Sequence, residues 1–340
     1  MLSFTFGTVK VDFTGDPHLG RKFNGVPLDR VGEREASQLK QFREELMNDS
    51  DINIMVGDLF DSFLVSNEVI LAVYEAYRQA VKLRPSKQFY LISGNHDISR
   101  DVEVVSSFKL IEPALNSLPN VTVAMKPMVV NTKNIDFLLM PYSEFDTAQQ
   151  AIDKVQHTNY RYQFVVGHWD TIEMSGPHNQ MPLETLSKIA GTVISGHEHI
   201  PYKFGITEEG KRTDKFETAP TQVYGTGSLQ PYSHGEDPEG KIYVTMKLSE
   251  VEDQLARNPH YFKDKSLRIL VLPGEEVPAN IDCLQFAIKR VGEEKAEDME
   301  VTIGDFDFKQ LWDETFKEHN VSDELTDDYY KAYTQKANNA

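Results

Sequence analysis

The residues most able to do chemistry come in five short groups, each placed just after an apolar run. The fullest group is the stretch 94–97, with the sequence Gly-Asn-His-Asp, which follows the run 89–92. Three consecutive polar side chains do not extend a buried strand, but they suit a loop at its carboxyl end, where α/β folds bind ligands. Asparagine offers a neutral oxygen ligand, histidine a ligand or a proton, and aspartate an orienting carboxylate. Taken alone, the stretch is equally well explained as a polar turn.

Four other apolar runs end in the same kind of polar group, each beside or near a glycine, and five of the ten histidines fall in these groups. A single buried histidine is usually a packed core residue, but five at predicted strand ends are hard to explain as packing. Neighbouring glycines let the backbone turn sharply and leave space above the sheet. The side chains that the five groups supply are Asp16, His18, Asp58, Asn95, His96, His168, His197 and His199.

These groups offer carboxylate, imidazole and amide ligands but no thiolate. This set suits Mn²⁺, Fe²⁺, Mg²⁺ or Zn²⁺ better than copper(I) or an iron–sulfur cluster. Apart from His96, the five groups supply seven ligands. Seven ligands are too many for one metal ion, but they suit two ions that share one ligand. Two ions about 3.5–4 Å apart would hold a hydroxide for in-line attack at phosphorus and neutralise charge in the transition state. His96 is then free to act as a general acid, and Asp97 is predicted to orient it.

The elements that must position these groups alternate between strands and helices. Apolar patterns predict strands over 8–14, 52–56 and 89–92, with helices over 30–48 and 66–82 between them. This order indicates a sheet covered by helices. Further strands are predicted over 121–124, 135–140, 163–166, 191–194, 221–224 and 242–248, with a polar hairpin turn at 208–211. The strand over 242–248 is predicted to be the last of the catalytic sheet.

The sequence changes in character after about residue 250. Two strands are predicted over 267–272 and 284–291, followed by a charged linker over 292–299 and two short helices. Each helix carries an apolar stripe that either packs against the main domain or docks onto another protein. We favour docking, because the helices are acidic, carry aromatic stripes and follow a linker. The stripe residues are Phe308, Leu311, Trp312 and Phe316 in the first helix, and Leu325, Tyr329 and Tyr333 in the second.

Composition narrows the class of protein. The 340 residues are 40% hydrophobic, enough for a substantial core in one large domain or two. The apolar runs are strand-length and the first residues lack the features of a secretion signal, so no membrane span or export is expected. The single cysteine, Cys283, excludes an internal disulfide and suits the cytoplasm, or a host cytoplasm if a phage encodes the chain. Because the net charge is −18, a nucleic-acid substrate requires local basic patches, metal ions or a partner.

The order of the five groups resembles the calcineurin-like metallophosphoesterases. The motifs are D-x-H at 16–18, G-D at 57–58, G-N-H-D at 94–97, G-H at 167–168 and G-H-x-H at 196–199. The resemblance implies a four-layer α-β-β-α sandwich of the α/β class that holds two divalent metal ions. It also implies that Asp58 bridges the two ions and that His96 is the catalytic histidine. The remaining implied ligands are Asp16, His18 and His199 at one ion, and Asn95, His168 and His197 at the other.

Within that superfamily the chain is similar to the SbcD-type nuclease subunits of bacteria and phages. Residues 57–61 resemble the second motif of this group, and residues 224–230 resemble its tyrosine-glycine-serine loop. Two features depart from the group: Pro17 stands where many relatives have tryptophan, and about eight residues precede the first predicted strand. The layout beyond residue 250 resembles a capping domain followed by a C-terminal helical pair that docks onto an ATPase. The predicted domains are a nuclease domain over 1–250, a capping domain over 251–298 and a docking region over 299–340.

This likeness implies a metal-dependent DNA nuclease of recombination, repair and replication, acting as an exonuclease on double-stranded ends and an endonuclease on single strands. Its cofactor would be two divalent ions, Mn²⁺ first and Mg²⁺ as the alternative. It would form a homodimer within a heterotetramer with an SbcC-type coiled-coil ABC ATPase, which would supply much of the DNA-binding surface. The candidate contacts with the DNA backbone are Arg21, Lys22, Arg30 and Arg34, which a solvated basic helix end explains equally well.

Two other functions fit the sequence. A phosphoesterase for small molecules or phosphoproteins would use the same metals, but it gains little from docking helices. A non-catalytic scaffold for a repair ATPase would keep the fold, but it needs none of the seven ligands. Activity on a small phosphodiester without activity on DNA would favour the first, and failure to bind two Mn²⁺ per chain would favour the second.

Overall fold

The computed structural model describes residues 1–23, 25–99, 101, 103–155, 160–171, 178–278 and 281–291. The chain divides into two compact units. The first comprises Met1–Val271 and Glu275–Lys289, and it contains every predicted metal ligand. The second comprises Leu272–Gly274 and Arg290–Ala340, most of which lies outside the described residues.

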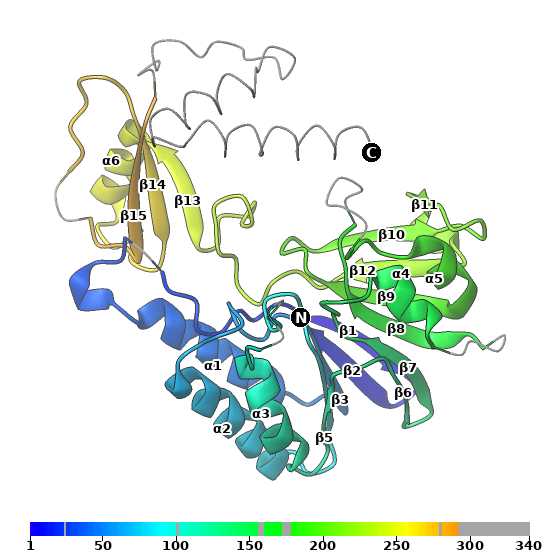
Figure 1. Ribbon diagram of the computed structural model, residues 1–340. Coiled ribbons are helices and arrows are strands. Elements are labelled where there is room, and N and C mark those ends of the chain that lie inside the picture. Colours follow the sequence, from blue (N-terminus) through cyan, green and yellow to red (C-terminus); the bar gives the residue numbers. More distant parts are fainter. Residues whose placement is uncertain are drawn as a thin grey trace, which may run out of the picture. The chain divides into compact units, whose positions relative to one another are not determined.

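The first sheet has five strands in the order β1-β2-β3-β4-β5 (Figure 1). Strands β2 to β5 run parallel, and β1 pairs with β2 in an antiparallel hairpin. Side chains alternate along β3, where Ile54 and Val56 belong to the core between the sheets and Met55 to the core under the helices. The strands span Leu2–Phe6 (β1), Val9–Thr14 (β2), Ile52–Val56 (β3), Gln88–Ile92 (β4) and Val121–Ala124 (β5).

The second sheet is mixed, with seven strands in the order β11-β10-β12-β9-β8-β7-β6. Strands β7, β8, β9 and β12 run parallel, whereas β6 and β10 flank them in antiparallel pairing. Strand β11 pairs with β10 across the predicted turn at 208–211. The strands span Met128–Thr132 (β6), Ile135–Met140 (β7), Tyr162–His168 (β8), Ala190–Gly196 (β9), Tyr202–Ile206 (β10), Arg212–Thr213 (β11) and Thr221–Gly225 (β12).

Three buried apolar clusters hold the layers together. The two sheets pack face to face, with Phe13 against Phe164 at a ring-centroid distance of 5.3 Å. Helices α1, α2 and α3 cover the outer face of the first sheet, and α4 and α5 cover that of the second (Figure 1). The layers follow the order helix, sheet, sheet, helix, and the predicted mixed α/β fold is confirmed. The helices span Glu33–Met47 (α1), Asn67–Leu83 (α2), Ser107–Asn116 (α3), Ala148–Asp153 (α4) and Leu183–Ile189 (α5), with short 3₁₀ turns at Leu28–Arg30 and Phe216–Thr218.

A small third sheet has the strand order β13-β14-β15. Strands β13 and β14 pair in parallel, which requires a crossover connection, and α6 supplies it. The prediction that 242–248 ends the catalytic sheet is therefore wrong, whereas the predicted strands over 267–272 and 284–291 are present as β14 and β15. The elements span Tyr243–Lys247 (β13), Leu248–Arg257 (α6), Ser266–Val271 (β14) and Gln285–Arg290 (β15).

The start of the chain also differs from expectation. Residues 2–6 form the edge strand β1, and its Leu2 and Phe4 pack against the core between the sheets. Helices α3 to α6 and strands β6, β10 and β11 have no counterpart among the predicted elements. The predicted linker over 292–299, both C-terminal helices and every docking candidate lie outside the described residues.

No helix in the described part of the chain combines the length and apolarity needed to cross a membrane. The domain boundaries at 250 and 298 and the cytoplasmic location stay predictions.

Candidate metal centre

Five loops meet beyond the carboxyl ends of β2, β3, β4, β8 and β9. Within each sheet these strands run parallel, so their ends lie at one edge. Contacts of 3.6 Å or less link all seven predicted ligands into one cluster. The cluster is largely buried, because Asp16, His18, Asp58 and His168 are each at most 1% exposed. Folding thus gathers ligands that are spread from residue 16 to residue 199.

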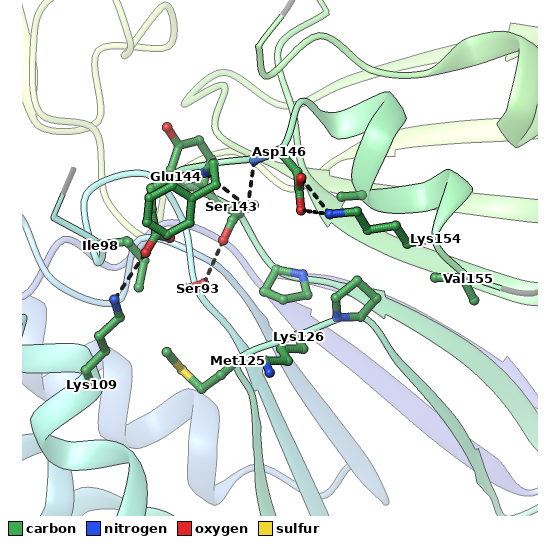
Figure 2. Close-up of a pocket in the computed structure, with 15 residues that line it drawn as sticks. Ser93, Ile98, Lys109, Met125, Lys126, Ser143, Glu144, Asp146, Lys154 and Val155 are labelled. Atoms are coloured by element: carbon green, nitrogen blue, oxygen red, sulfur yellow. Dashed lines mark hydrogen bonds and ion pairs between the residues drawn. The ribbon is translucent and has the colours of Figure 1, made fainter. Parts of the chain in front are cut away.

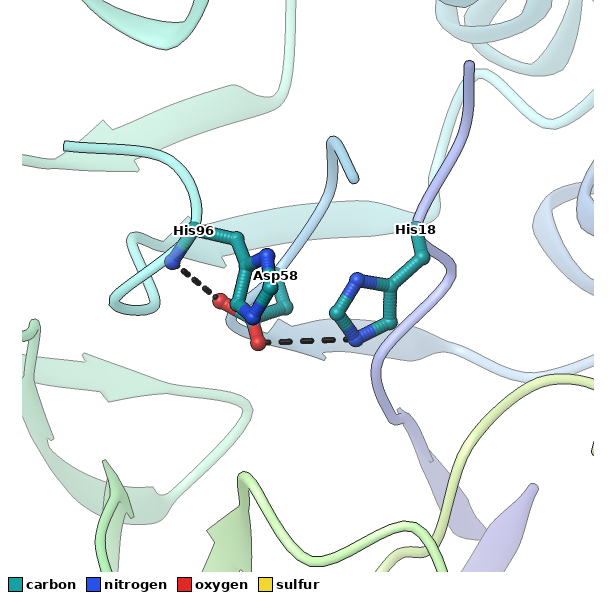
Figure 3. A group of neighbouring side chains, drawn as sticks. All are labelled: His18, Asp58 and His96. Atoms are coloured by element: carbon teal, nitrogen blue, oxygen red, sulfur yellow. Dashed lines mark hydrogen bonds and ion pairs between the residues drawn. The ribbon is translucent and has the colours of Figure 1, made fainter. Parts of the chain in front are cut away.

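Asp58 lies at the middle of this cluster. Its Oδ2 is 3.5 Å from His18 Nε2 and 3.3 Å from His168 Nε2. Its Oδ1 accepts a hydrogen bond of 2.9 Å from the backbone N–H of His96 (Figure 3). Two groups of side chains bring ligand atoms close enough to hold one ion each: His18, Asp58 and His96, and Asp58, His168 and His197. Asp58 is the member that both groups share.

The first half of the centre is built on two facing imidazoles. The Nε2 atoms of His18 and His199 lie 3.1 Å apart. In each ring the outer nitrogen, Nδ1, is the one that does not face the other histidine, and it has a carboxylate beside it. His199 Nδ1 lies 3.3 Å from Glu236 Oε2, and His18 Nδ1 lies 3.6 Å from Asp61 Oδ1. When these outer nitrogens carry the protons, both inner nitrogens present lone pairs to each other.

The second half repeats this arrangement with an amide oxygen between two imidazoles. Asn95 Oδ1 lies 3.0 Å from His168 Nε2 and 2.9 Å from His197 Nδ1. The outer nitrogens again have acceptors, because His168 Nδ1 lies 3.0 Å from Val56 O and His197 Nε2 lies 2.6 Å from Asp170 Oδ1. The inner nitrogens, only 3.3 Å apart, therefore direct lone pairs at the amide oxygen and at each other.

Asp16 lies between the two halves. Its Oδ2 accepts a 2.9 Å hydrogen bond from the backbone N–H of His197, and its Oδ1 lies 3.6 Å from His168 Nδ1. Asp16 Oδ1 is buried without a hydrogen-bond partner among the described residues. A buried acceptor in that state costs about 1–3 kcal/mol, so the atom needs a positive partner.

Converging lone pairs and carboxylates repel one another unless cations lie between them. The outer acceptors are also the partners that metal-bound histidines use to fix their tautomer and orientation. Both observations fit one divalent cation in each half, with Asp58 shared. Nitrogen and oxygen donors without sulfur suit Mn²⁺, Fe²⁺, Mg²⁺ or Zn²⁺, and the geometry does not choose among them.

The family model for calcineurin-like phosphoesterases matches residues 9–201, more than half of the chain. The chain belongs to this family. The predicted superfamily is confirmed, and with it a metal-dependent phosphoesterase of the hydrolase class. No curated protein matches the sequence, so the family carries the assignment by itself.

In this calcineurin-like phosphoesterase, three buried side chains of the centre have shifted pKa values. Burial raises the pKa of Asp16 to about 7. Burial opposes the charge on His168 too, but the carboxylates of Asp58 and Asp16 outweigh it and raise the pKa of His168 to about 10. The same pairing with His168 holds the pKa of Asp58 below its usual range, against the effect of burial. The Asp58 carboxylate therefore stays ionised because positive charge lies beside it, and a divalent cation bound there would supply that charge in place of the His168 proton.

His96 differs from the four predicted histidine ligands because its side chain is exposed. Its ring lies edge-on to His18, with centroids 4.8 Å apart. Its Nδ1 lies 2.6 Å from the carbonyl oxygen of Asp61, which leaves Nε2 available to a substrate. This placement suits proton transfer at the rim of the metal centre.

The prediction that Asp97 orients His96 is wrong. Asp97 is fully buried, and its two oxygens accept hydrogen bonds from the backbone N–H groups of Leu59, Phe60 and Gly94 at 2.9–3.1 Å. The side chain thereby ties the loop that carries Asp58 to the loop that carries Asn95 and His96. Asp61, through its carbonyl, is the residue that orients His96.

Four residues around the centre were missed as functional. Asp61 stands inside the motif 57–61, and Asp170 follows the G-H motif at 167–168 by two residues. An acidic residue close to a ligand was the available signal in both cases. Glu236 and Tyr232 follow the last motif, and nothing in the sequence marks them. The Tyr232 ring contacts both His18 and His199, and its hydroxyl donates to Asp16 O at 2.8 Å.

The four basic residues predicted to contact DNA separate into two pairs. Arg30 and Arg34 are 8% and 2% exposed, because residues in and around the small sheet cover them. Arg30 donates to Lys263 O and faces Asp282, whereas the Arg34 guanidinium lies over the Tyr243 ring. Neither is exposed to a phosphate backbone, so the prediction fails for this pair.

Arg21 and Lys22 are placed differently. Arg21 Nη1 pairs with Asp61 Oδ1 at 3.1 Å, and the guanidinium lies over the Tyr232 ring. The Arg21 side chain is 34% exposed, and Lys22 is exposed. These two remain candidates for contacts with a substrate's phosphates.

Strained backbone marks the ligand loops. Asp16, His18, Asp58 and His197 adopt φ angles of 32°, 43°, 49° and 80°, in the left-handed region that non-glycine residues rarely enter. Each such residue costs roughly 1–3 kcal/mol and persists because the surroundings over-determine it. Strain at four of the seven predicted ligands indicates that ligand geometry, rather than loop stability, dictates these turns.

Gly94 shows how tightly these loops pack, and replacing it by alanine is expected to lower activity by about 100-fold. A Cβ at Gly94 would lie 2.1 Å from Asp58 Oδ1 and 2.4 Å from its backbone nitrogen, so the shared ligand must move. Gly191→Ala is the matched control, since its Cβ would meet nothing closer than 3.5 Å. Phosphodiester turnover and thermal unfolding of both variants check this, and a fully active Gly94→Ala enzyme would contradict the packing argument.

Proposed function

We propose that this protein is the nuclease subunit of an SbcCD-type repair complex, cutting DNA phosphodiesters at a two-metal centre. The observation that carries the proposal is the pair of side-chain groups that share Asp58, one of which includes the exposed His96. Two metal ions about 3.5–4 Å apart would form a clamp for in-line displacement at phosphorus, the reaction that a nuclease performs.

The residues of the chain divide the work of that reaction. Divalent cations held in the centre would activate water and neutralise charge on the phosphate. His96, with Nδ1 held by the Asp61 carbonyl, gives a proton from Nε2 to the leaving oxygen. Arg21, fixed between Asp61 and Tyr232, offers a positive charge for a phosphate next to the scissile one.

Two features support nucleic acid as the substrate. The loop 224–230, which resembles that of SbcD-type nucleases, packs onto the centre: Ser228 N donates to His199 O and Leu229 N donates to Asp16 O. Arg21 and Lys22 also supply local positive charge in a chain of net charge −18. Metal ions and a DNA-binding partner would offset the remaining repulsion.

The partner in this proposal is an SbcC-type coiled-coil ABC ATPase, and the subunit works as a homodimer with Mn²⁺. The domain plan is a nuclease domain, a capping domain around the small sheet and a docking region over 299–340. Because β13 already belongs to the small sheet, the capping domain in this plan begins at Tyr243 rather than at residue 251.

The test is cleavage of a linear duplex and of a single-stranded oligonucleotide with Mn²⁺, with and without the ATPase and ATP. Cleavage that rises with the ATPase supports both the chemistry and the partnership. Cleavage of a small phosphodiester with no cleavage of either DNA would instead favour an enzyme for small molecules or phosphoproteins.

Deleting residues 300–340 is expected to weaken association with the ATPase by at least about tenfold while leaving Mn²⁺ binding and small-diester hydrolysis unchanged. The reason is that the aromatic stripes would be removed and every predicted ligand kept. Affinity for the ATPase is measured by calorimetry beside the Mn²⁺ content of the same protein. Unaltered association would place the docking surface elsewhere.

A further inference from the structure

A cavity of about 640 Å³ lies beside the loop that carries Asn95 and His96, and none of the predicted ligands lines it. Figure 2 shows the residues that line this cavity. Its volume falls within the range of roughly 300–1,000 Å³ that is typical of ligand sites. The lining is mostly apolar and includes Ile98, Met125, Pro127, Tyr142 and Phe145. Phosphodiester cleavage at the metal centre does not involve this cavity, so the function of the cavity is a separate question.

One wall of the cavity is the loop that carries Asn95 and His96. Ser93 and Ile98 line the cavity and flank this loop on both sides. Two trans peptide units separate His96 from Ile98, so their Cα atoms are at most about 7.6 Å apart. The opposite wall is joined to the same loop, because Tyr142 N donates to Ser93 O at 2.9 Å. The cavity and the catalytic histidine therefore share one loop.

Three lysines surround the cavity although the chain is strongly acidic. Lys109 on α3 pairs with Glu144 at 3.2 Å, and Lys154 at the end of α4 pairs with Asp146 at 2.6 Å. Figure 2 shows these two pairs on different sides of the cavity, with Lys126 between them.

Lys126, in the turn between β5 and β6, is exposed and makes no ion pair with any described residue. Its charge is therefore available to an anionic ligand. An apolar floor with a free ammonium at the rim matches a molecule that has a flat apolar part and a phosphate.

Phe145 adds a surface for stacking. It lines the cavity, yet it is 68% exposed, an unusual state for a phenylalanine. An exposed ring next to lysines is how proteins hold unpaired bases, because every base has a face that stacks. A base within a duplex cannot enter such a cavity without leaving its stack.

We propose that this cavity holds one unpaired nucleotide of the strand that is cut, with its base against Phe145 and Tyr142 and its phosphate near Lys126. This inference rests on the proposed nuclease function and specifies its substrate: strand ends or single strands in which a base is free to turn out. The cavity then selects unpaired DNA next to the scissile bond.

Kinetics on two substrates test the proposal. Phe145→Ala and Lys126→Glu are each expected to raise KM for a 15-residue oligothymidine by about tenfold, with kcat and the hydrolysis of bis(p-nitrophenyl) phosphate unchanged. Phe145→Tyr and Lys126→Arg should behave like the wild type. The matched control is Lys211→Glu, which reverses the charge of an exposed lysine in the turn of the β10–β11 hairpin.

A second measurement does not depend on turnover. An oligonucleotide carrying 5-iodouracil, irradiated on the full-length protein, should crosslink to Phe145 or Tyr142 and lose that crosslink in Phe145→Ala. Crosslinks confined to other residues, or unchanged KM in both cavity variants, would overturn the inference and leave the nuclease function standing. A wild-type protein that hydrolyses the small diester but neither cuts nor crosslinks the oligonucleotide would overturn the nuclease function itself, and this inference with it.

Discussion

Replacing His96 by alanine is expected to lower phosphodiester cleavage by about 10²–10⁴-fold while leaving two metal ions bound. Alanine keeps the backbone N–H that donates to Asp58, and none of the seven predicted ligands changes. What is lost is an exposed imidazole at the rim of the centre, held by the Asp61 carbonyl for proton transfer. Turnover of a small phosphodiester with Mn²⁺ and the Mn²⁺ content of the same preparation are the two readouts.

The matched control is His260→Ala. His260 is 75% exposed and pairs with Asp282, far along the chain from the five motifs, so its loss should not affect turnover. A His96→Ala protein that loses one metal would make His96 a ligand, consistent with its place beside His18 and Asp58. Normal turnover without His96 would remove it from the chemistry.

Replacing Asp58 by alanine is expected to have the largest effect, because both halves of the centre depend on this one carboxylate. Its Oδ2 faces His18 on one side and His168 on the other, at 3.5 and 3.3 Å. Without the Asp58 carboxylate, the centre has less negative charge to hold two cations, and at least one of the two cations should be lost. Several kcal/mol of transition-state stabilisation would go with it, or roughly 10³-fold or more in turnover.

Asp58→Asn sharpens this test, since it keeps the size of the side chain and one carbonyl oxygen but removes the charge. It should bind metal more weakly than the wild type and turn over slowly. Asp253→Asn on the exposed face of α6 is the control and should be indistinguishable from the wild type. Two metals bound at normal affinity in Asp58→Ala would contradict the bridging role.

The sequence predicted which side chains gather beyond the strand ends, because that signal is local. Each motif follows an apolar run and contains a glycine or lies next to one, and parallel strands then bring their carboxyl ends together without further information. The structure adds why the glycines are needed: a Cβ at Gly57 would lie 2.3 Å from His168 Nδ1. Such close approach between loops far apart in the sequence is not visible from either loop alone.

Features that depend on distant partners could not be read from the sequence. Arg30 and Arg34 look like a basic helix end, yet partners more than 190 residues away bury them. Glu236 stands in no motif and gains its role only because folding brings it to His199. The strand over 242–248 was assigned to the wrong sheet because α6, the crossover helix that follows it, was not recognised.

The central claim is that two cations share Asp58, and anomalous diffraction from crystals grown with Mn²⁺ tests it most directly. The account predicts two peaks about 3.5–4 Å apart, both within coordination distance of Asp58. One peak should lie beside His18 and His199, and the other beside His168 and His197. A single peak, or two peaks that do not both touch Asp58, would contradict the shared-ligand centre on which the proposed chemistry depends.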